Sequence, residues 1–159
     1  MDLLPFIQWC EGSALGSAIR TSPWAFAVIE SVHLLALSVI GGAVLIVDLR
    51  LLGFGLRRQS VAQVARDARP WFVGSLIVML VTGIALFMSE PVKCYYSTPF
   101  WVKMISLALS IVFAFTVRWK VTQADETRVR PVWFKLVALV SLVLWFGVGA
   151  GGRWIGFSG

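Results

Sequence analysis

The chain has 159 residues, of which 58% are hydrophobic and 14% charged, and its mean hydropathy is +0.84. A soluble domain of this size carries roughly 25% charged residues, so too little polar surface exists here to face water all round. This composition indicates an integral membrane protein. The formal net charge of +6 does not indicate a nucleic-acid partner, because basic residues collect on the cytoplasmic loops of membrane proteins.

The first residues predict a short amphipathic helix. Asp2 and Glu11 lie in a stretch without basic residues, which excludes the positively charged start of a cleaved signal peptide. Apolar residues recur at a helical spacing, at Leu3, Ile7, Ala14, Leu15 and Ala18. We therefore expect one short helix over residues 2–19 that lies in the outer membrane interface.

Four apolar stretches follow, and each is close to the ~20 residues that cross the hydrocarbon of a bilayer. The predicted spans are residues 24–47, 70–89, 99–117 and 131–152. Ser22-Pro23 and Thr98-Pro99 each place a hydroxyl cap before a proline, a typical helix start. The four spans and their short connections use the whole length, residues 1–159, as one domain. The predicted fold is an all-α, integral membrane four-helix bundle.

The basic residues predict the orientation of the bundle. Ten of them lie between spans one and two, or between spans three and four and in the first turns of the latter. They are Arg50, Arg57, Arg58, Arg66, Arg69, Arg118, Lys120, Arg128, Arg130 and Lys135. The positive-inside rule places these loops in the cytoplasm and both termini outside. We therefore expect a multi-pass protein of a bacterial inner membrane, with Asp48 and Arg50 solvated at its cytoplasmic edge.

His33, the only histidine, lies inside the first span, and Glu30 precedes it by one helical turn. An ionisable pair at this depth is costly unless it faces the bundle interior. One interpretation is a structural clip in which Glu30 accepts a hydrogen bond from a buried His33. The preferred interpretation is a haem b site with His33 as axial ligand and Glu30 as the acceptor for its second ring nitrogen.

Other residues complete the predicted haem site. Gly41, two turns beyond His33, would leave room for the flat macrocycle. Lys103 and Arg153, near the outer ends of spans three and four, would bind the propionates. Methionine is the remaining common axial ligand in the absence of a second histidine, and Met79 lies at the depth closest to that of His33. Close packing through small residues and simple snorkelling of the cations are the structural alternatives.

Two other metal sites are compatible with this sequence. His33, Met79 and Met104 are ligands that select copper, although the chain has no Met-x-x-Met cluster. Cys10 and Cys94, both expected outside, are further copper ligands or a disulfide pair. Glu30-x-x-His33 also has the spacing of a di-iron motif, but such a site needs a second motif and two further glutamates. We therefore set the di-iron site aside, except as a site at the interface of a symmetric dimer.

Short motifs resemble two groups of membrane proteins. Glu30-Ser-Val-His33-Leu-Leu, Gly41-Gly42 and Val47-Asp-Leu-Arg-Leu-Leu-Gly53 resemble the first helix of small bacterial membrane proteins of unknown function. Thr82-Gly83 and Thr98-Pro-Phe-Trp-Val-Lys103 resemble a helix pair of copper-resistance protein D (CopD) and its relatives. The resemblance implies copper uptake, and the likeness of those cores to transmembrane b-type cytochromes implies haem. His33 and Lys103 are the residues that it carries over.

These patterns together predict a haem b-binding membrane protein with a role in electron transfer or haem sensing. The alternatives are a copper-handling, CopD-like transporter and a structural subunit of a membrane complex. No motif of a hydrolase or nucleotide-binding enzyme is present, so no catalytic residue is expected. The glycine-rich helix faces predict a homo-oligomer or a membrane redox partner in the lipid bilayer.

Overall fold

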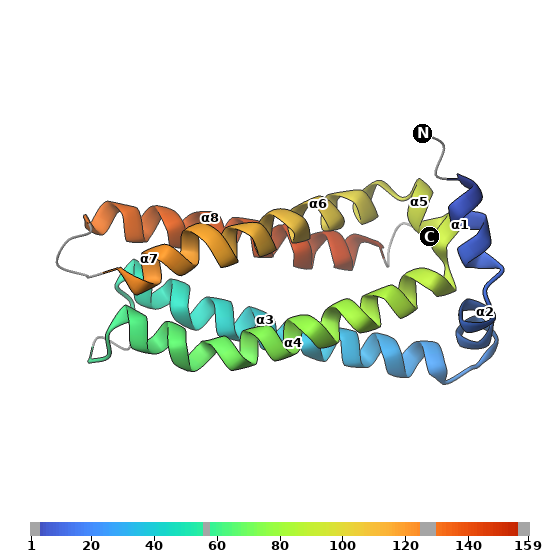
Figure 1. Ribbon diagram of the computed structural model, residues 1–159, viewed down its shortest axis with the longest axis horizontal. Helices are drawn as coiled ribbons and strands as arrows, with labels where there is room; N and C mark the ends of the chain where they lie inside the picture. Colours follow the sequence, from blue (N-terminus) through green and yellow to red (C-terminus); the bar gives the residue numbers. More distant parts are fainter. Residues whose placement is uncertain (1–3, 56–57, 125–129, 156–159) are drawn as a thin grey trace.

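The computed structural model describes residues 4–55, 58–124 and 130–155, and within these ranges it is helical with no strand. Four long helices lie roughly side by side (Figure 1). They are α3 (Ala25–Leu52), α4 (Val61–Ser89), a continuous helix over Thr98–Gln123, and α8 (Pro131–Ile155). The third comprises α6 (Thr98–Phe113), the π-helical turn η1 (Ala114–Arg118) and α7 (Trp119–Gln123). The predicted all-α four-helix bundle is confirmed.

The surface of the bundle is apolar along all four long helices. Large hydrophobic side chains point outward, with exposed fractions of 67% at Leu35, 62% at Val81 and 77% at Phe146. Each long helix has the length and composition to cross a membrane. Such a surface is unfavourable in water and favourable against acyl chains. The protein is therefore a multi-pass membrane protein.

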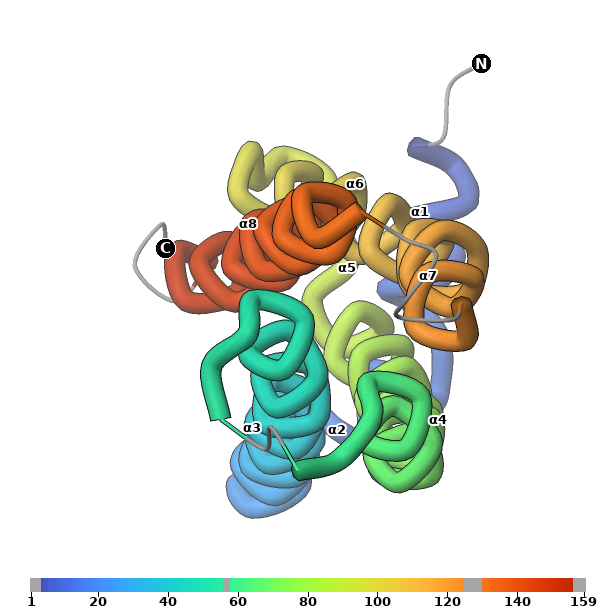
Figure 2. Tube along the Cα trace, turned by 90° about the vertical axis from the view of Figure 1, so that its left-hand side faces the viewer, coloured from blue at the N-terminus to red at the C-terminus, as the bar shows by residue number. Residues whose placement is uncertain are grey.

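The helices pack as two pairs. Helix α3 packs along α4, and α6 packs along α8, while α3 also contacts α8 (Figure 2). The core between the pairs contains Ile40, Val44 and Val148, all at most 1% exposed. Phe72 of α4 meets Trp145 of α8 edge to face, with ring centroids 5.6 Å apart. Along their described lengths α4 and α6 make almost no close backbone contact, which leaves space between them for the candidate site.

The helices extend beyond the predicted spans at the end where the basic residues gather, here called the arginine-rich end. Helix α3 continues to Leu52, α4 begins at Val61, and the third helix ends at Gln123. Local capping sets these ends. Gly53 adopts a left-handed φ of 87° after α3, and the Ser60 side chain accepts a hydrogen bond from the Gln63 amide at the start of α4.

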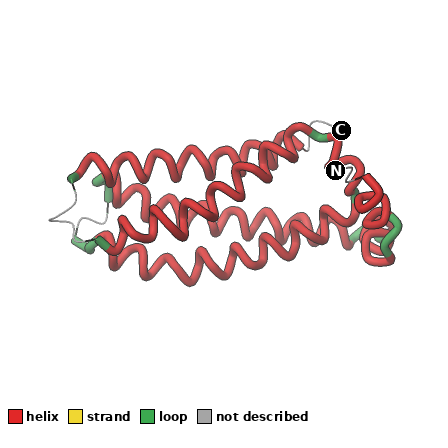
Figure 3. Tube along the Cα trace, turned by 45° about the horizontal axis from the view of Figure 1, so that its top comes forward, coloured by secondary structure: helices red, strands yellow, loops and turns green. Residues whose placement is uncertain are grey.

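The opposite end, here called the capped end, is covered by three short helices. These are α1 (Leu4–Glu11), α2 (Ala14–Thr21) and α5 (Pro91–Tyr96). Figure 3 shows that the described residues outside the helices lie at the two ends of the bundle. Helix α1 and the last turn of α8 both lie at this end of the bundle (Figure 1).

The prediction of one helix over residues 2–19 is wrong, because Gly12 and Ser13 interrupt it. The Ser13 hydroxyl accepts a hydrogen bond from the Gly16 amide and so starts a second helix. Helix α2 then packs closely on the end of α4, where a Cβ at Gly16 would collide with the Met88 carbonyl oxygen. The Arg20 guanidinium donates to the carbonyls of Ser89 and Glu11, at 3.0 and 3.1 Å. These bonds fix the N-terminal helices to the bundle.

Candidate functional site

His33 lies on the buried face of α3, where a hydroxyl group from α4 holds its imidazole. Only 6% of the residue is exposed. Nδ1 lies 2.9 Å from Thr82 Oγ1. The Thr82 hydroxyl donates its single proton to the Val78 carbonyl, 2.7 Å away, so its oxygen accepts from Nδ1–H. We infer from this network that neutral His33 carries its proton on Nδ1 and presents Nε2 as an acceptor.

Lys103 is the second polar group of the site and comes from the first turns of α6. Its Nζ lies 3.3 Å from His33 Nε2 and donates to it. Among the described residues no carboxylate forms an ion pair with this ammonium. The site therefore combines a cation with an imidazole and lacks a balancing negative charge.

Glycines on two neighbouring helices allow His33 and Lys103 to approach one another. A Cβ at Gly83 of α4 would lie 3.3 Å from His33 Cε1. A Cβ at Gly151 of α8 would lie 3.1 Å from the Cβ of Lys103 and 3.2 Å from its amide nitrogen. All three distances are shorter than ordinary van der Waals contact. Larger side chains at either position would displace one member of the pair.

His33 and Lys103 border a cavity of about 400 Å³ between α4 and α6. Helices α1 and α5 contribute Ile7 and Tyr95 to its wall at the capped end. The remaining wall is mostly apolar or aromatic, and its aromatic side chains are Phe6, Phe87, Tyr95, Phe100 and Trp101. Phe87 and Phe100 stack across the two helices, with ring centroids 5.6 Å apart. The site is thus a cavity with mostly apolar walls and with the His33 imidazole and the Lys103 ammonium at one side.

The structure brings four of the predicted site residues together. His33, Met79, Lys103 and Met104 all line this cavity. Met79 is 2% exposed, whereas Met104 is 41% exposed and reaches the outer surface of α6. Thr82 and Gly83, which contact His33, were not predicted as site residues, although the sequence shows them as a small-residue pair inside the second span.

Three predicted site residues lie elsewhere. The prediction that Glu30 accepts a hydrogen bond from His33 is wrong, because Glu30 is exposed and both ring nitrogens contact other residues. Over three residues an α-helix turns by about 300°. The Glu30 side chain therefore points about 60° away from the direction of the His33 side chain. Gly41 is also exposed, with nothing within 4 Å of an added Cβ. Arg153 is exposed and does not line the cavity.

The two cysteines are free thiols and do not line the cavity. Cys10 is buried in α1 and Cys94 is partly buried in α5. Burial, with the Glu90 carboxylate nearby, raises the pKa of the Cys94 thiol. Neither thiol therefore contributes a ligand to the His33 site in this arrangement.

We expect the Thr82→Val substitution to disturb His33 at nearly constant side-chain volume. The buried Nδ1–H would lose its acceptor, which lowers the free energy of unfolding by about 1–3 kcal/mol. Nitrogen NMR of the imidazole should show Nδ1 protonated in the wild type and a mixture of tautomers in the variant. Thr116→Val is the matched control, because exposed Thr116 bonds only within its own helix, to the Val112 carbonyl. If the two substitutions changed the free energy of unfolding and the imidazole NMR signals equally, the assignment of the proton to Nδ1 would be contradicted.

Comparison with protein-family models matches residues 6–158 to a family of unknown function, DUF6644. The chain belongs to this family. The match includes His33, Thr82 and Lys103 and nearly all of the described helices. No curated protein and no solved structure matches the chain. The resemblance to copper-resistance protein D and to b-type cytochromes therefore stays a prediction.

A second buried polar cluster lies at the arginine-rich end of this DUF6644 chain. Asp48 is fully buried, and its Oδ1 accepts a hydrogen bond from Arg118 Nε at 3.0 Å. Arg118 Nη2 donates to the Val44 carbonyl at 3.2 Å. Arg118 ends η1, and π-helical turns occur frequently at functional sites. The prediction that Asp48 is solvated beside Arg50 is wrong, because Asp48 shares the buried face of α3 with Val44.

Proposed function

We propose that the protein binds haem b in the cavity between α4 and α6, with His33 Nε2 as an axial ligand of the iron. The observation that carries this proposal is the 2.9 Å contact between Nδ1 and Thr82. Metal-binding histidines ordinarily donate their second ring N–H to an orienting acceptor of this kind. Thr82 is the hydrogen-bond acceptor for the second ring nitrogen of His33, the role that the sequence predicted for Glu30. When bound, haem supplies one-electron redox chemistry.

The cavity has properties that fit the macrocycle. Its volume of about 400 Å³ falls within the ~300–1,000 Å³ typical of small-molecule sites. Its walls are mostly apolar and aromatic, as a porphyrin ring requires, and its polar side chains are His33, Lys103 and Tyr95. Because α4 and α6 are separated along this length, the edge of a flat ligand can extend between them toward lipid.

Lys103 and Met79 have complementary roles in this proposal. Coordination through Nε2 requires the Lys103 ammonium to leave its position 3.3 Å away. A propionate provides the negative charge that this ammonium lacks, and charge-assisted bonds of this type are the stronger ones. Buried Met79, which lines the same cavity, would offer its thioether as a second ligand of the iron. The predicted propionate contact from Arg153 is not part of the proposal.

The physiological use that follows is electron transfer or haem sensing, with no catalytic residue. Electron transfer requires a redox partner in the membrane or a second copy of the chain. The arginine-rich end would face the cytoplasm of a bacterial cell, which is supported by the gathering of basic residues there. The haem site would then lie in the outer half of the membrane.

Copper handling is the second candidate, because His33, Met79 and Met104 line one cavity. One imidazole and two thioethers form a ligand set that selects copper. The ammonium 3.3 Å from Nε2 opposes it, since a bare metal cation brings no anion to balance Lys103. Haem brings two propionates, and we therefore prefer haem.

The absorption spectrum and metal content of the purified protein distinguish haem binding from copper binding. Haem binding predicts a red preparation with a Soret band and about one iron per chain. A colourless preparation that keeps stoichiometric copper through dialysis would replace haem with copper. If neither cofactor is retained and added hemin and copper do not bind, both proposals fail and the bundle is a structural subunit.

A further inference from the structure

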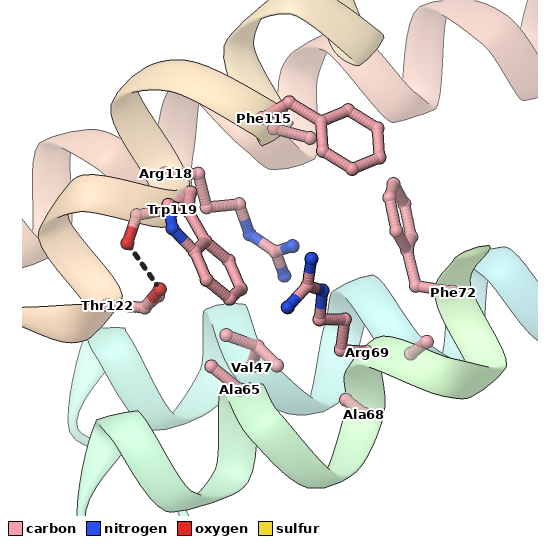
Figure 4. Close-up of a pocket in the computed structure, with 11 residues that line it drawn as sticks. Val47, Ala65, Ala68, Arg69, Phe72, Phe115, Arg118, Trp119 and Thr122 are labelled. Atoms are coloured by element: carbon pink, nitrogen blue, oxygen red, sulfur yellow. Dashed lines mark hydrogen bonds between the residues drawn. The ribbon is translucent and has the colours of Figure 1, made fainter.

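A second, smaller cavity lies at the arginine-rich end, far from His33 along α3. Its volume is about 40 Å³, and it is bordered by α4, by the segment η1–α7 and by α3. Arg69 of α4 and Arg118 of η1 extend their guanidinium groups into it and toward one another (Figure 4). Two like charges face each other here between mostly apolar side chains.

Within the described ranges, Asp48 balances the charge of Arg118, but no carboxylate pairs with Arg69. Arg118 uses Nε for Asp48 and Nη2 for the Val44 carbonyl. Its side chain is 10% exposed, and among the described residues Nη1 has no hydrogen-bond partner. The Arg69 guanidinium stacks on the Trp119 ring, 4.3 Å from its centroid. No carboxylate appears in the described lining of the cavity.

We propose that Arg69 and Arg118 together bind the phosphate group of an anionic ligand, with the phosphate of an anionic lipid or free phosphate as its source. Guanidinium groups match the geometry of phosphate oxygens and form charge-assisted hydrogen bonds with them. An anion between the two groups removes their mutual repulsion and gives Arg118 Nη1 a partner. This site is independent of the proposed haem site.

The position and size of the cavity agree with a phosphate at the membrane surface. Arg69 directly precedes the charge-free stretch 70–89, and Arg118 directly follows the charge-free stretch 104–117. Both therefore lie at the level of the headgroups, and Trp119 lies beside them as an interfacial anchor. A volume of about 40 Å³ exceeds the ~10–15 Å³ that one water needs. It accommodates one or two phosphate oxygens, with the rest of the ligand outside.

Native mass spectrometry of the full-length, delipidated protein in detergent tests this proposal. The probes are phosphatidylglycerol, phosphatidylcholine and inorganic phosphate. We expect phosphatidylglycerol to remain bound more tightly than phosphatidylcholine, and Arg69→Gln to weaken it roughly tenfold, as expected for loss of one charged hydrogen bond. Arg66→Gln is the matched control, because exposed Arg66 lies on the same helix outside the cavity. It should leave binding unchanged.

The added phosphate identifies the source of the anion. Binding of phosphatidylglycerol that millimolar inorganic phosphate does not displace supports a lipid headgroup. Tight binding of phosphate itself, lost in Arg69→Gln, supports a soluble anion at the same site. Equal losses in Arg69→Gln and Arg66→Gln would overturn the proposal, since they would show only general attraction to a basic surface. Absence of binding by both anions would overturn it as well.

Discussion

Replacing Arg118 with methionine should lower the free energy of unfolding by about 3–5 kcal/mol, the usual effect of removing one partner from a buried ion pair. Asp48 is fully buried, and its Oδ1 accepts a hydrogen bond from Arg118 Nε at 3.0 Å. Its Oδ2 already has no hydrogen-bond partner within the described ranges. The variant would leave a carboxylate among apolar helices with no cation beside it. Unfolding in mixed micelles of mild detergent and dodecyl sulfate measures the change.

The double variant Asp48→Asn with Arg118→Met separates charge pairing from packing. It removes both charges at nearly constant volume, so it leaves no unpaired charge in the core. We therefore expect it to recover most of the stability lost in Arg118→Met. A double variant as unstable as the single one would show that Arg118 acts through packing and its bond to Val44.

Replacing Gly151 with leucine should both destabilise the bundle and disturb the candidate site. The Cβ of the new side chain would lie 3.1 Å from the Lys103 Cβ and 3.2 Å from its backbone. Overpacking of this kind costs about 1–3 kcal/mol, because α6 must move away from α8. Lys103 moves with α6, so its contact with His33 Nε2 should be lost. Unfolding in mixed micelles and nitrogen NMR of the imidazole report the two effects.

Gly149→Leu is the matched control on the same helix. An added Cβ at Gly149 meets nothing within 4 Å, so the side chain extends into lipid. We expect less than about 0.5 kcal/mol of change, as for surface positions in general. Comparable destabilisation by the two substitutions would contradict the close packing of α6 on α8 at Gly151.

The fold was predictable because its main determinants are local in the sequence. The lengths of the apolar stretches and the positions of the basic residues indicate four spans. Ser22-Pro23 marks the start of α3, where the Ser22 hydroxyl accepts a hydrogen bond from the Ala25 amide. The inner boundaries were less predictable. Helix α4 begins at Val61, because helical hydrogen bonding continues past the membrane surface until a cap ends it.

The partners of the buried polar groups could not be predicted in the same way. Helical spacing near His33 pointed to Glu30, but the observed partners, Thr82 and Lys103, are 49 and 70 residues away. Asp48 and Arg118 are also 70 residues apart. Such pairs depend on which faces of different helices meet, and one sequence alone does not specify the rotation of each helix about its axis. His33 and Lys103 were identified because an isolated ionisable residue in a span is itself a functional signal.

The Gly41 prediction failed for a related reason. Eight residues beyond His33, an α-helix has turned about 80° away from the His33 direction. The buried face continues through Ala36, Ile40 and Val44, and Gly41 lies outside it. A small residue two turns from a ligand therefore indicates room for a cofactor only when it lies in the same direction from the helix axis as the ligand.

A hemin titration of the purified wild-type protein and the His33→Ala variant tests the central claim most directly. The account predicts a saturable Soret band at one hemin per chain in the wild type. In His33→Ala, affinity should fall by more than the ~10–100-fold lost when partners of metal ligands are mutated, while Glu30→Ala titrates like the wild type. A wild-type protein that binds no hemin, or a His33→Ala variant that binds it equally well, would contradict haem ligation by His33.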